Sequence, residues 1–336
     1  MTNSAVAQKM RSAHALWYVA QGKAELRSEP LPDPARDEVL VRSLYSAVSR
    51  GTERLIISGA VPQSEWERMR APLQAGSFPF PVKYGYCAAG IVEAGPEELT
   101  GRTVFVLQPH QDYFVAPAQM AVPVPEDVPP KRATLAANME TALNALWDAG
   151  AGPADRIVVV GAGIVGVLIA YLATRLPGAD VTLVDTLPER AQIADQFGFR
   201  FALPDDTPRE ADVVFHTSAT AQGLATAIGA AGLEATIIEL SWYGEGSVQA
   251  PLGGAFHSRR LRLVSSQVGQ VAPSRRARWS HRRRLEAALS LLHDARLDIL
   301  VTDEIDFRDA PDRLPEVLAP GASGLAPVIR YPAPTI

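Results

Sequence analysis

Cysteine is almost absent from this chain of 336 residues, which has a single one at position 87. A disulfide within the chain is therefore excluded, and so is a zinc site built mainly from cysteines. Positive charge is not in excess either: the formal net charge is -5, which argues against a general nucleic-acid-binding protein. A long uninterrupted apolar run is also lacking. The nearest candidate, 157–176, contains three glycines and Arg175, so it predicts a strand followed by a helix and not a membrane segment.

A leader sequence is not expected, because residues 1–11 have neither an apolar core nor a cleavage-site pattern. We therefore expect a cytoplasmic protein. Hydrophobic residues make up 47% of the chain and charged residues 21%, values that are usual for a globular protein. The length exceeds that of one ordinary core, which predicts two domains.

The first third of the chain predicts a mostly antiparallel β domain. Short segments rich in valine, isoleucine and aromatic residues are separated by glycine and proline. These segments are 13–19, 38–44, 88–94, 103–107 and 113–116. A helix follows over 133–149, where apolar residues recur at helical spacing.

The middle of the chain predicts a parallel, doubly wound sheet, because β and α segments now alternate. The predicted strands are 157–160, 181–184, 213–215, 236–240 and 261–266. The predicted helices between them are 164–175, 191–197 and 224–229. An amphipathic helix over 283–294 and a tail of strands and turns complete the chain.

A glycine motif lies between the first of these strands and its helix. The stretch 157–166 reads IVVVGAGIVG, a G-x-G-x-x-G pattern in the setting that dinucleotide binding requires. Gly161 would allow the tight turn, Gly163 would let the backbone approach a pyrophosphate, and Gly166 would let helix and strand pack closely. With Ile164 and Val165, these glycines present the helix N-terminus, whose partial positive charge of about 0.5 suits phosphates.

An acidic residue, Asp185, ends the second strand of the predicted sheet, 19 residues after Gly166. A carboxylate there accepts hydrogen bonds from the adenosine ribose and disfavours a 2′-phosphate, which predicts NAD as the cofactor. Arg190 could instead accommodate that phosphate, so NADP remains the alternative. The other interpretation of the motif is a nucleotide-free α/β domain with a glycine turn.

The order of these parts, together with several local patterns, resembles the medium-chain dehydrogenase/reductase superfamily. The patterns are LPDPARDEVLV (31–41), GYCAAGIVEAG (85–95), DYFVAPAQMAVPVP (112–125) and VDTLPER (184–190). The resemblance implies a GroES-like catalytic domain (1–130), a Rossmann domain (131–266) and a return to the catalytic domain (267–336). A shorter likeness, SRGTERL (49–55) followed by SG (58–59), is similar to the bacteriochlorophyllide hydroxyethyl dehydrogenase branch.

The resemblance also shows departures at the metal positions. Zinc-type relatives have a cysteine where this chain has Ser49, a Gly-His-Glu motif where it has Gly85-Tyr86-Cys87, and a third ligand near Ala137. The four cysteines of the structural zinc lobe are missing as well. We therefore predict no bound metal. A rearranged site using Cys87, His110 and Glu140 is conceivable, but their spacing does not argue for it.

Without zinc, side-chain donors would have to act on the substrate oxygen. The resemblance places four candidates in the active cleft: Tyr86, Ser49, His110 and Glu140. Each has a structural alternative. Tyr86 could fill the volume of the missing metal, Ser49 could cap a turn, His110 could be a solvated loop residue, and Glu140 could form an ion pair.

Further cofactor contacts follow from the same resemblance. Thr141 is expected to touch the nicotinamide, Ser241 and Trp242 to flank its ring together with 265–267, and Ser218 to lie nearer the adenine side. Nine arginines between 259 and 284 form a separate feature. They could grip an anionic substrate, or they could be a solvated helix face or a subunit contact.

The sequence therefore predicts a zinc-independent, NAD(H)-dependent oxidoreductase acting on an alcohol or ketone. The alternatives are a quinone or enone reductase, a hydroxyethyl-tetrapyrrole dehydrogenase, and an NAD-binding protein without catalysis. The expected partners are a small-molecule substrate and a second copy of the chain in a homodimer, with no nucleic acid and no membrane.

Overall fold

The computed structural model describes residues 11–333 and divides the chain into two units. The first unit combines the chain up to Thr134 with the part from Val301 onward, and the second is Leu135–Leu300. Residues 267–300, predicted from the sequence to belong to the first unit, lie in the second. An amphipathic helix shows that one face must be covered, but not which surface covers it.

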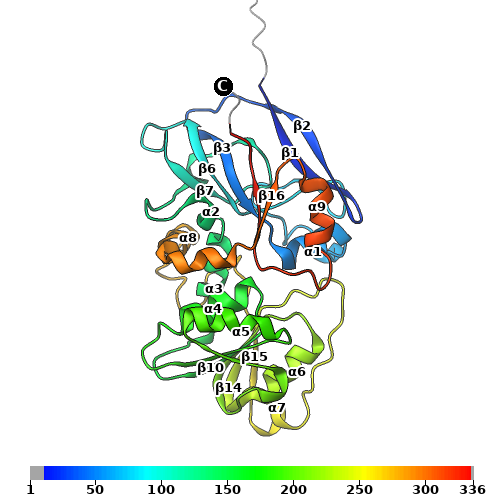
Figure 1. Cartoon of the computed structure of the whole chain (residues 1–336), viewed down its shortest axis with the longest axis vertical. Helices are drawn as coiled ribbons and strands as arrows, with labels where there is room; N and C mark the ends of the chain where they lie inside the picture. Colours follow the sequence, from blue (N-terminus) through cyan, green and yellow to red (C-terminus); the bar gives the residue numbers. More distant parts are fainter. Residues whose placement is uncertain (1–10, 334–336) are drawn as a thin grey trace, which may run out of the picture. The chain divides into compact units, whose positions relative to one another are not determined.

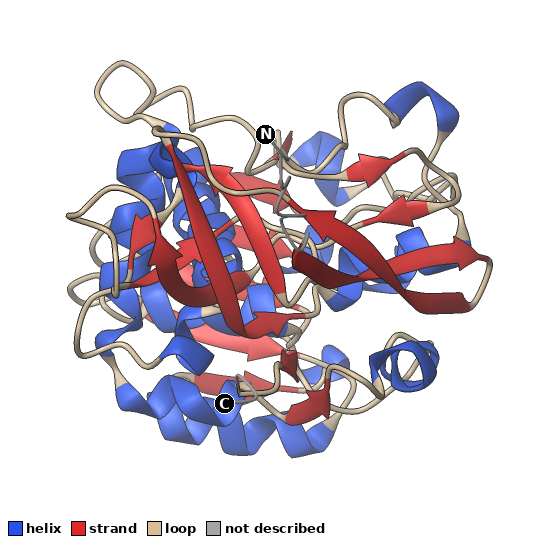
Figure 2. Cartoon of the chain, turned by 90° about the horizontal axis from the view of Figure 1, so that it is seen from above, coloured by secondary structure: helices blue, strands red, loops and turns tan. Residues whose placement is uncertain are grey.

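The first unit is built mainly from antiparallel strands, drawn in red in Figure 2. Its strands are β1 (Arg11–Ala20), β2 (Lys23–Leu31), β3 (Glu38–Ala47), β4 (Ala75–Gly76), β5 (Val82–Lys83), β6 (Ala88–Ala94), β7 (Thr103–Val106), β8 (Tyr113–Pro117), β9 (Val122–Pro123), β16 (Asp303–Asp306) and β17 (Pro327–Arg330). Its helices are α1 (Arg50–Ser58), α2 (Pro130–Ala133) and α9 (Ala310–Val317).

Two sheets organise these strands. One has the order β2-β1-β5-β4, and the other runs β16-β17-β3-β6-β7-β9 with β8 pairing β3. Val39 and Val41 of β3 are fully buried and pack with Val104, Val106 and Phe114. The antiparallel β domain predicted from the sequence is thus present, although β2 and α1 were missed because both are rich in charged residues.

The second unit is a six-stranded parallel sheet with helices on both faces (Figure 1). Its strands are β10 (Arg156–Val160), β11 (Asp180–Val184), β12 (Arg200–Ala202), β13 (Ala211–His216), β14 (Ala231–Glu239) and β15 (Arg262–Ser265). Its helices are α3 (Ala136–Ala149), α4 (Ile164–Ala173), α5 (Ala191–Phe197), α6 (Ala221–Ala230), α7 (Ala255–Ser258) and α8 (His281–Ser290). In Figure 1, α3, α4 and α5 lie on one side of this sheet and α6 and α7 on the other.

The strand order in this sheet is β12-β11-β10-β13-β14-β15. This is the order 3-2-1-4-5-6 of a doubly wound dinucleotide-binding fold, in which the chain reverses direction across the sheet between its first and fourth strands. Residues 157–160 of β10 are buried because helices cover both faces, which explains their continuous run of β-branched side chains. The switch point therefore lies between β10 and β13.

Candidate functional site

The glycine loop between β10 and α4 has three glycines with three different surroundings. A Cβ on Gly166 would overlap the carbonyl oxygen of Gly161, so only glycine allows α4 to lie this close to the loop. Gly161 has φ +109, and a Cβ there would come within 2.7 Å of the Ser218 backbone nitrogen. A Cβ on the exposed Gly163, in contrast, would meet nothing within 4 Å. The open side of the loop at Gly163 is therefore shaped to let a ligand reach the backbone.

The N-terminus of α4 is not capped by any side chain, since its N-cap residue is Gly163. Ile164 and Val165 form its first turn and are half-buried. The first backbone N–H groups of a helix have no partner within the helix. Together with the helix dipole, they offer an anion site beside the open face of Gly163.

Asp185 follows β11 and ties the glycine loop to the next loop. One carboxylate oxygen accepts a hydrogen bond from the Ala162 backbone nitrogen at 2.6 Å, and the other from the Leu187 nitrogen at 3.0 Å. Two backbone donors fix the carboxylate, and it keeps lone pairs for further donors. Arg190 is half-buried at the end of the 3₁₀ turn η3 (Pro188–Arg190).

Beyond the switch point, the loop after β13 packs on the glycine loop. The Thr217 hydroxyl donates to the carbonyl oxygen of Gly161 at 2.8 Å. The next residue, Ser218, contacts the Nε2 atom of His216 through its hydroxyl at 2.7 Å. Ser241, after β14, accepts a hydrogen bond from the Ala219 backbone nitrogen at 3.1 Å. Ser218 and Ser241, both predicted as cofactor contacts, are thus brought to the same edge of the sheet.

An acid that sequence reasoning missed lies at this edge as well. Glu239 ends β14, and its carboxylate is 2.7 Å from Nδ1 of the fully buried His216. It also accepts hydrogen bonds from the Ser241 backbone nitrogen and from the Tyr243 hydroxyl. Burial alone would raise the pKa of Glu239, but the hydrogen bonds from His216 and Ser241 hold it below its usual value. The sequence did contain a signal for Glu239: it directly follows the apolar run ATII (235–238), as Asp185 directly follows VTLV (181–184).

Trp242 and Thr141 are the remaining predicted cofactor contacts. Trp242 is half-buried in the loop after β14. Thr141 lies on α3 and donates its hydroxyl hydrogen to the Ala137 carbonyl oxygen at 2.9 Å. Their contact with a nicotinamide stays a prediction.

In the first unit, Tyr86 and Ser49 contact each other directly. The Tyr86 hydroxyl lies 2.5 Å from the Ser49 hydroxyl oxygen and 3.1 Å from that of Thr52. Ser49 is the N-cap residue of α1, but its side chain makes no capping hydrogen bond to the helix. Its hydroxyl contacts Tyr86 instead. Burial raises the pKa of Tyr86 well above its usual value, and the Cys87 thiol beside it adds to the shift. Tyr86 is therefore a neutral hydrogen-bond donor and not a phenolate base.

His110 corrects one expectation from the sequence. Its side chain is 0% exposed, so it neither lies on a solvated loop nor touches a substrate directly. Its Nε2 atom is 2.9 Å from the Glu53 carboxylate, and its Nδ1 atom is 2.7 Å from the Ser46 hydroxyl. Glu53 in turn accepts hydrogen bonds from the Tyr18 hydroxyl and from the Ser49 backbone nitrogen. His110 thus supports the start of α1 from inside the core, and any influence on chemistry passes through Ser49.

Glu140 is likewise a structural residue. Its carboxylate is 2.9 Å from the Nε atom of Arg284, and both side chains are almost fully buried. Arg284 also donates to the Asn144 side chain and to the carbonyl oxygens of Val268 and Gln270. This ion pair, the alternative weighed for Glu140, joins α8 and the segment before it to α3. A catalytic role for Glu140 stays a prediction, and the ion pair favours its structural alternative.

The nine arginines between 259 and 284 do not form one binding surface, since several of them pair with glutamates or lie over tryptophan rings. Arg259, Arg260, Arg282 and Arg284 each pair with a glutamate. Arg275 and Arg283 lie over the rings of Trp147 and Trp279, which contact each other.

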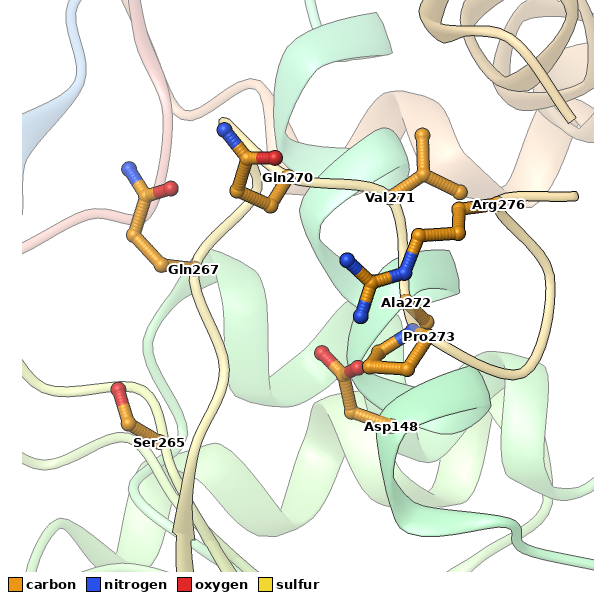
Figure 3. Close-up of a pocket in the computed structure, with 8 residues that line it drawn as sticks. All are labelled: Asp148, Ser265, Gln267, Gln270, Val271, Ala272, Pro273 and Arg276. Atoms are coloured by element: carbon orange, nitrogen blue, oxygen red, sulfur yellow. The ribbon is translucent and has the colours of Figure 1, made fainter.

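Arg276 lines a pocket of about 310 Å³ that begins at the carboxyl end of β15. Figure 3 shows the Arg276 guanidinium beside the Asp148 carboxylate, whereas the amides of Gln267 and Gln270, which also line the pocket, point away from this pair. The pocket therefore offers both signs of charge, and an anionic substrate stays a prediction.

Two further properties concern metals and membranes. Across residues 11–333, no three or more His, Cys, Asp or Glu side chains are grouped so that they could hold a metal ion. Ser49 and Tyr86, at two positions where the resemblance implies zinc ligands, are neutral hydroxyls bonded to each other, which is not a donor set that zinc prefers. In the same described part of the chain, no helix combines the length and apolarity needed to cross a membrane.

Comparison with known proteins agrees with this architecture. No protein-family model matches the chain. D-guloside 3-dehydrogenase of Escherichia coli K12 is 25% identical over 308 residues, covering 82% of this chain and 87% of that protein. A structure described as a zinc-binding dehydrogenase, from Sinorhizobium meliloti 1021 and bound to NADP, matches with TM-score 0.75 and 18% identity, over 95% of this chain and 99% of the other. An alcohol dehydrogenase from Escherichia coli CFT073 in complex with NADH matches with TM-score 0.74 and 16% identity, over the same shares.

These likenesses confirm the predicted fold, a GroES-like domain combined with a Rossmann domain. The likeness to the bacteriochlorophyllide branch and the lack of zinc stay predictions.

Proposed function

We propose that this protein is an NAD(H)-dependent oxidoreductase that interconverts a secondary alcohol and a ketone without zinc. The observation that carries the proposal is the glycine loop at the switch point of the 3-2-1-4-5-6 sheet. There the open face of Gly163, the uncapped start of α4 and the carboxylate of Asp185 lie together. When bound, the nicotinamide would accept or donate the hydride.

The residues of the second unit would hold the pyrophosphate and the adenosine ribose of the cofactor. Backbone N–H groups of Ile164 and Val165 would face the pyrophosphate, and Asp185 would accept hydrogen bonds from the adenosine ribose. A negative charge at this position opposes a 2′-phosphate, which supports NAD over NADP. Ser241, Trp242 and Thr141 are proposed contacts of the nicotinamide half, and Ser218 is a proposed contact nearer the adenine side.

Tyr86 and Ser49 would act on the substrate oxygen. Because its pKa is raised, the Tyr86 phenol keeps its proton and would donate a hydrogen bond to a ketone or alkoxide oxygen, while the proton that the alcohol loses on oxidation would pass to solvent. Ser49, which contacts the phenol at 2.5 Å, would fix its orientation. His110 and Glu53 would act only by holding Ser49 in place.

A polyhydroxylated substrate is supported by the curated relative. The name D-guloside 3-dehydrogenase describes oxidation at position 3 of a glycoside, which is a secondary hydroxyl. We propose that this chain takes a substrate of the same class, a sugar derivative with a free secondary hydroxyl.

The test combines cofactor binding with a substrate panel. Titration calorimetry of the purified protein is expected to give tighter binding of NAD⁺ than of NADP⁺. Absorbance at the NADH band is then followed with glycosides, simple secondary alcohols and enones. Reduction of enones alone would identify the enone-reductase alternative. Binding of NAD⁺ without turnover of any panel member would support the non-catalytic alternative, and binding of neither cofactor would refute the proposal.

We also propose a homodimer, as the sequence analysis expected. β15 is the last strand of the parallel sheet, and all four of its residues are exposed, including Leu263 at 39% and Val264 at 37%. An exposed edge strand with apolar side chains favours pairing with another chain. Sedimentation velocity at micromolar concentration is expected to show a dimer, and a monomer would contradict this.

A further inference from the structure

We propose that Glu239 is a second ribose-binding acid, which accepts a hydrogen bond from a hydroxyl of the nicotinamide ribose. The inference rests on the proposed function, since it assumes that a dinucleotide binds at the switch point. It adds an acidic residue to the nicotinamide half of the site, for which the sequence offered Thr141, Ser241, Trp242 and 265–267.

Glu239 lies at a position in the sheet that is equivalent to that of Asp185. A doubly wound sheet of this order consists of two β-α-β-α-β halves, each of which holds one mononucleotide. Here the halves are β10-β11-β12 and β13-β14-β15. Asp185 follows the second strand of the first half, and Glu239 ends the second strand of the other. Each acid is therefore at the equivalent edge position for the ribose of its half.

The carboxylates of Asp185 and Glu239 are held by hydrogen bonds of the same kind. One oxygen of each accepts the backbone N–H two residues later: Leu187 for Asp185 at 3.0 Å and Ser241 for Glu239 at 2.7 Å. The other oxygen accepts a donor from the end of the preceding parallel strand or its loop. This donor is the Ala162 nitrogen at 2.6 Å for Asp185, and Nδ1 of His216 at 2.7 Å for Glu239.

The Glu239 carboxylate can accept one more hydrogen bond than it accepts within the chain. A carboxylate has about four acceptor positions. Three on Glu239 are used, by Ser241, His216 and the Tyr243 hydroxyl. Nδ1 of His216 contacts the carboxylate at 2.7 Å, and Nε2 on the other side of the ring contacts the Ser218 hydroxyl at 2.7 Å. One acceptor position on Glu239 remains, and 15% of its side chain is exposed.

The link to the glycine loop supports a role in the same ligand site. Ser218, bonded to His216, directly follows Thr217, whose hydroxyl donates to the Gly161 carbonyl oxygen. The acid, the histidine and the loop therefore form one connected set of hydrogen bonds along the carboxyl edge of β10, β13 and β14. His216 is a positioning residue here, since it is fully buried and orients the carboxylate.

The experiment compares a whole dinucleotide with a probe of the first half alone. Titration calorimetry measures NAD⁺ and AMP binding to the full chain, its Glu239→Ala variant and its Asp185→Ala variant. Glu239→Ala is expected to weaken NAD⁺ about tenfold or more, the loss of one charged hydrogen bond, and to leave AMP within about twofold. Asp185→Ala is expected to weaken both ligands. The control, Glu286→Ala on the exposed face of α8, should change neither.

Three outcomes would overturn the inference. Unchanged NAD⁺ affinity in Glu239→Ala would remove the role of the acid. An equal loss of NAD⁺ and AMP would show that Glu239 only maintains the loops. Failure of the unaltered chain to bind either ligand would refute the proposed function itself, and this inference with it.

If Glu239→Ala does not fold, the test can be made on the ligand instead, by removing one ribose hydroxyl from NAD⁺. NAD⁺ carrying hydrogen in place of a nicotinamide-ribose hydroxyl is titrated into the unaltered protein, separately for the 2′ and 3′ positions. One of the two analogues is expected to bind about tenfold more weakly than NAD⁺. Equal affinity for both analogues and NAD⁺ would contradict the proposal.

Discussion

Replacing Gly166 with alanine is expected to lower the free energy of unfolding by about 3 kcal/mol or more, whereas the same change at Gly163 should leave it within about 1 kcal/mol. The two positions are three residues apart in one loop. A Cβ on Gly166 would overlap the backbone oxygen of Gly161, which cannot move without shifting the strand or the helix. A Cβ on Gly163 meets open space, and its φ of -71° suits alanine.

The same pair separates stability from ligand binding. Gly163→Ala places a methyl group where the pyrophosphate is proposed to approach, so the affinity for NAD⁺ should fall about tenfold or more. Urea denaturation measures the free energy of unfolding, and calorimetry measures the affinity for NAD⁺. A Gly163→Ala protein that binds NAD⁺ as tightly as the unaltered chain would show that the ligand does not lie against this part of the backbone.

Replacing Tyr86 with phenylalanine is expected to lower kcat by a factor of about 100 to 1000, with the affinity for NAD⁺ unchanged. This is the usual cost of removing one hydrogen-bond donor from the oxygen that gains charge in the transition state. Because burial raises the pKa of the phenol, its proton is retained throughout the working range. The pH profile of kcat should therefore show no ionisation that disappears with the Tyr86 hydroxyl.

The measurement is steady-state kinetics on the best substrate of the panel. Tyr113→Phe is the matched control, because Tyr113 is a half-exposed tyrosine of β8 in the same unit. Thermal unfolding of both variants checks that the Ser49 contact is not needed for folding. A Tyr86→Phe enzyme with kcat within twofold of the original would exclude the phenol from the chemistry.

The dinucleotide loop was predictable because its determinants are local. The loop 161–166, the buried strand before it and the acid after the next strand are separated by fixed distances in the sequence. Each of these features is needed for local contact with a dinucleotide and can be recognised without knowing the rest of the fold. The parallel sheet followed for the same reason, since alternating β and α segments admit few arrangements.

The chemistry-bearing side chains were less predictable because burial and pairing depend on distant segments. His110 follows a proline in a loop, and nothing local shows that Glu53 and Ser46 bury it. The partner of Glu140 is Arg284, 144 residues later. The resemblance to known enzymes placed these residues near a cleft, but it could not show that their polar atoms were already bonded.

The buried Arg284 has a practical consequence for dissecting the chain. Its guanidinium bridges α8, the backbone at Val268 and Gln270, and the side chains of Glu140 and Asn144. A fragment that stopped at residue 266 would leave the Glu140 carboxylate buried without its cation, a state that usually costs several kcal/mol. An autonomous nucleotide-binding piece should therefore extend to Leu300, where the second unit ends.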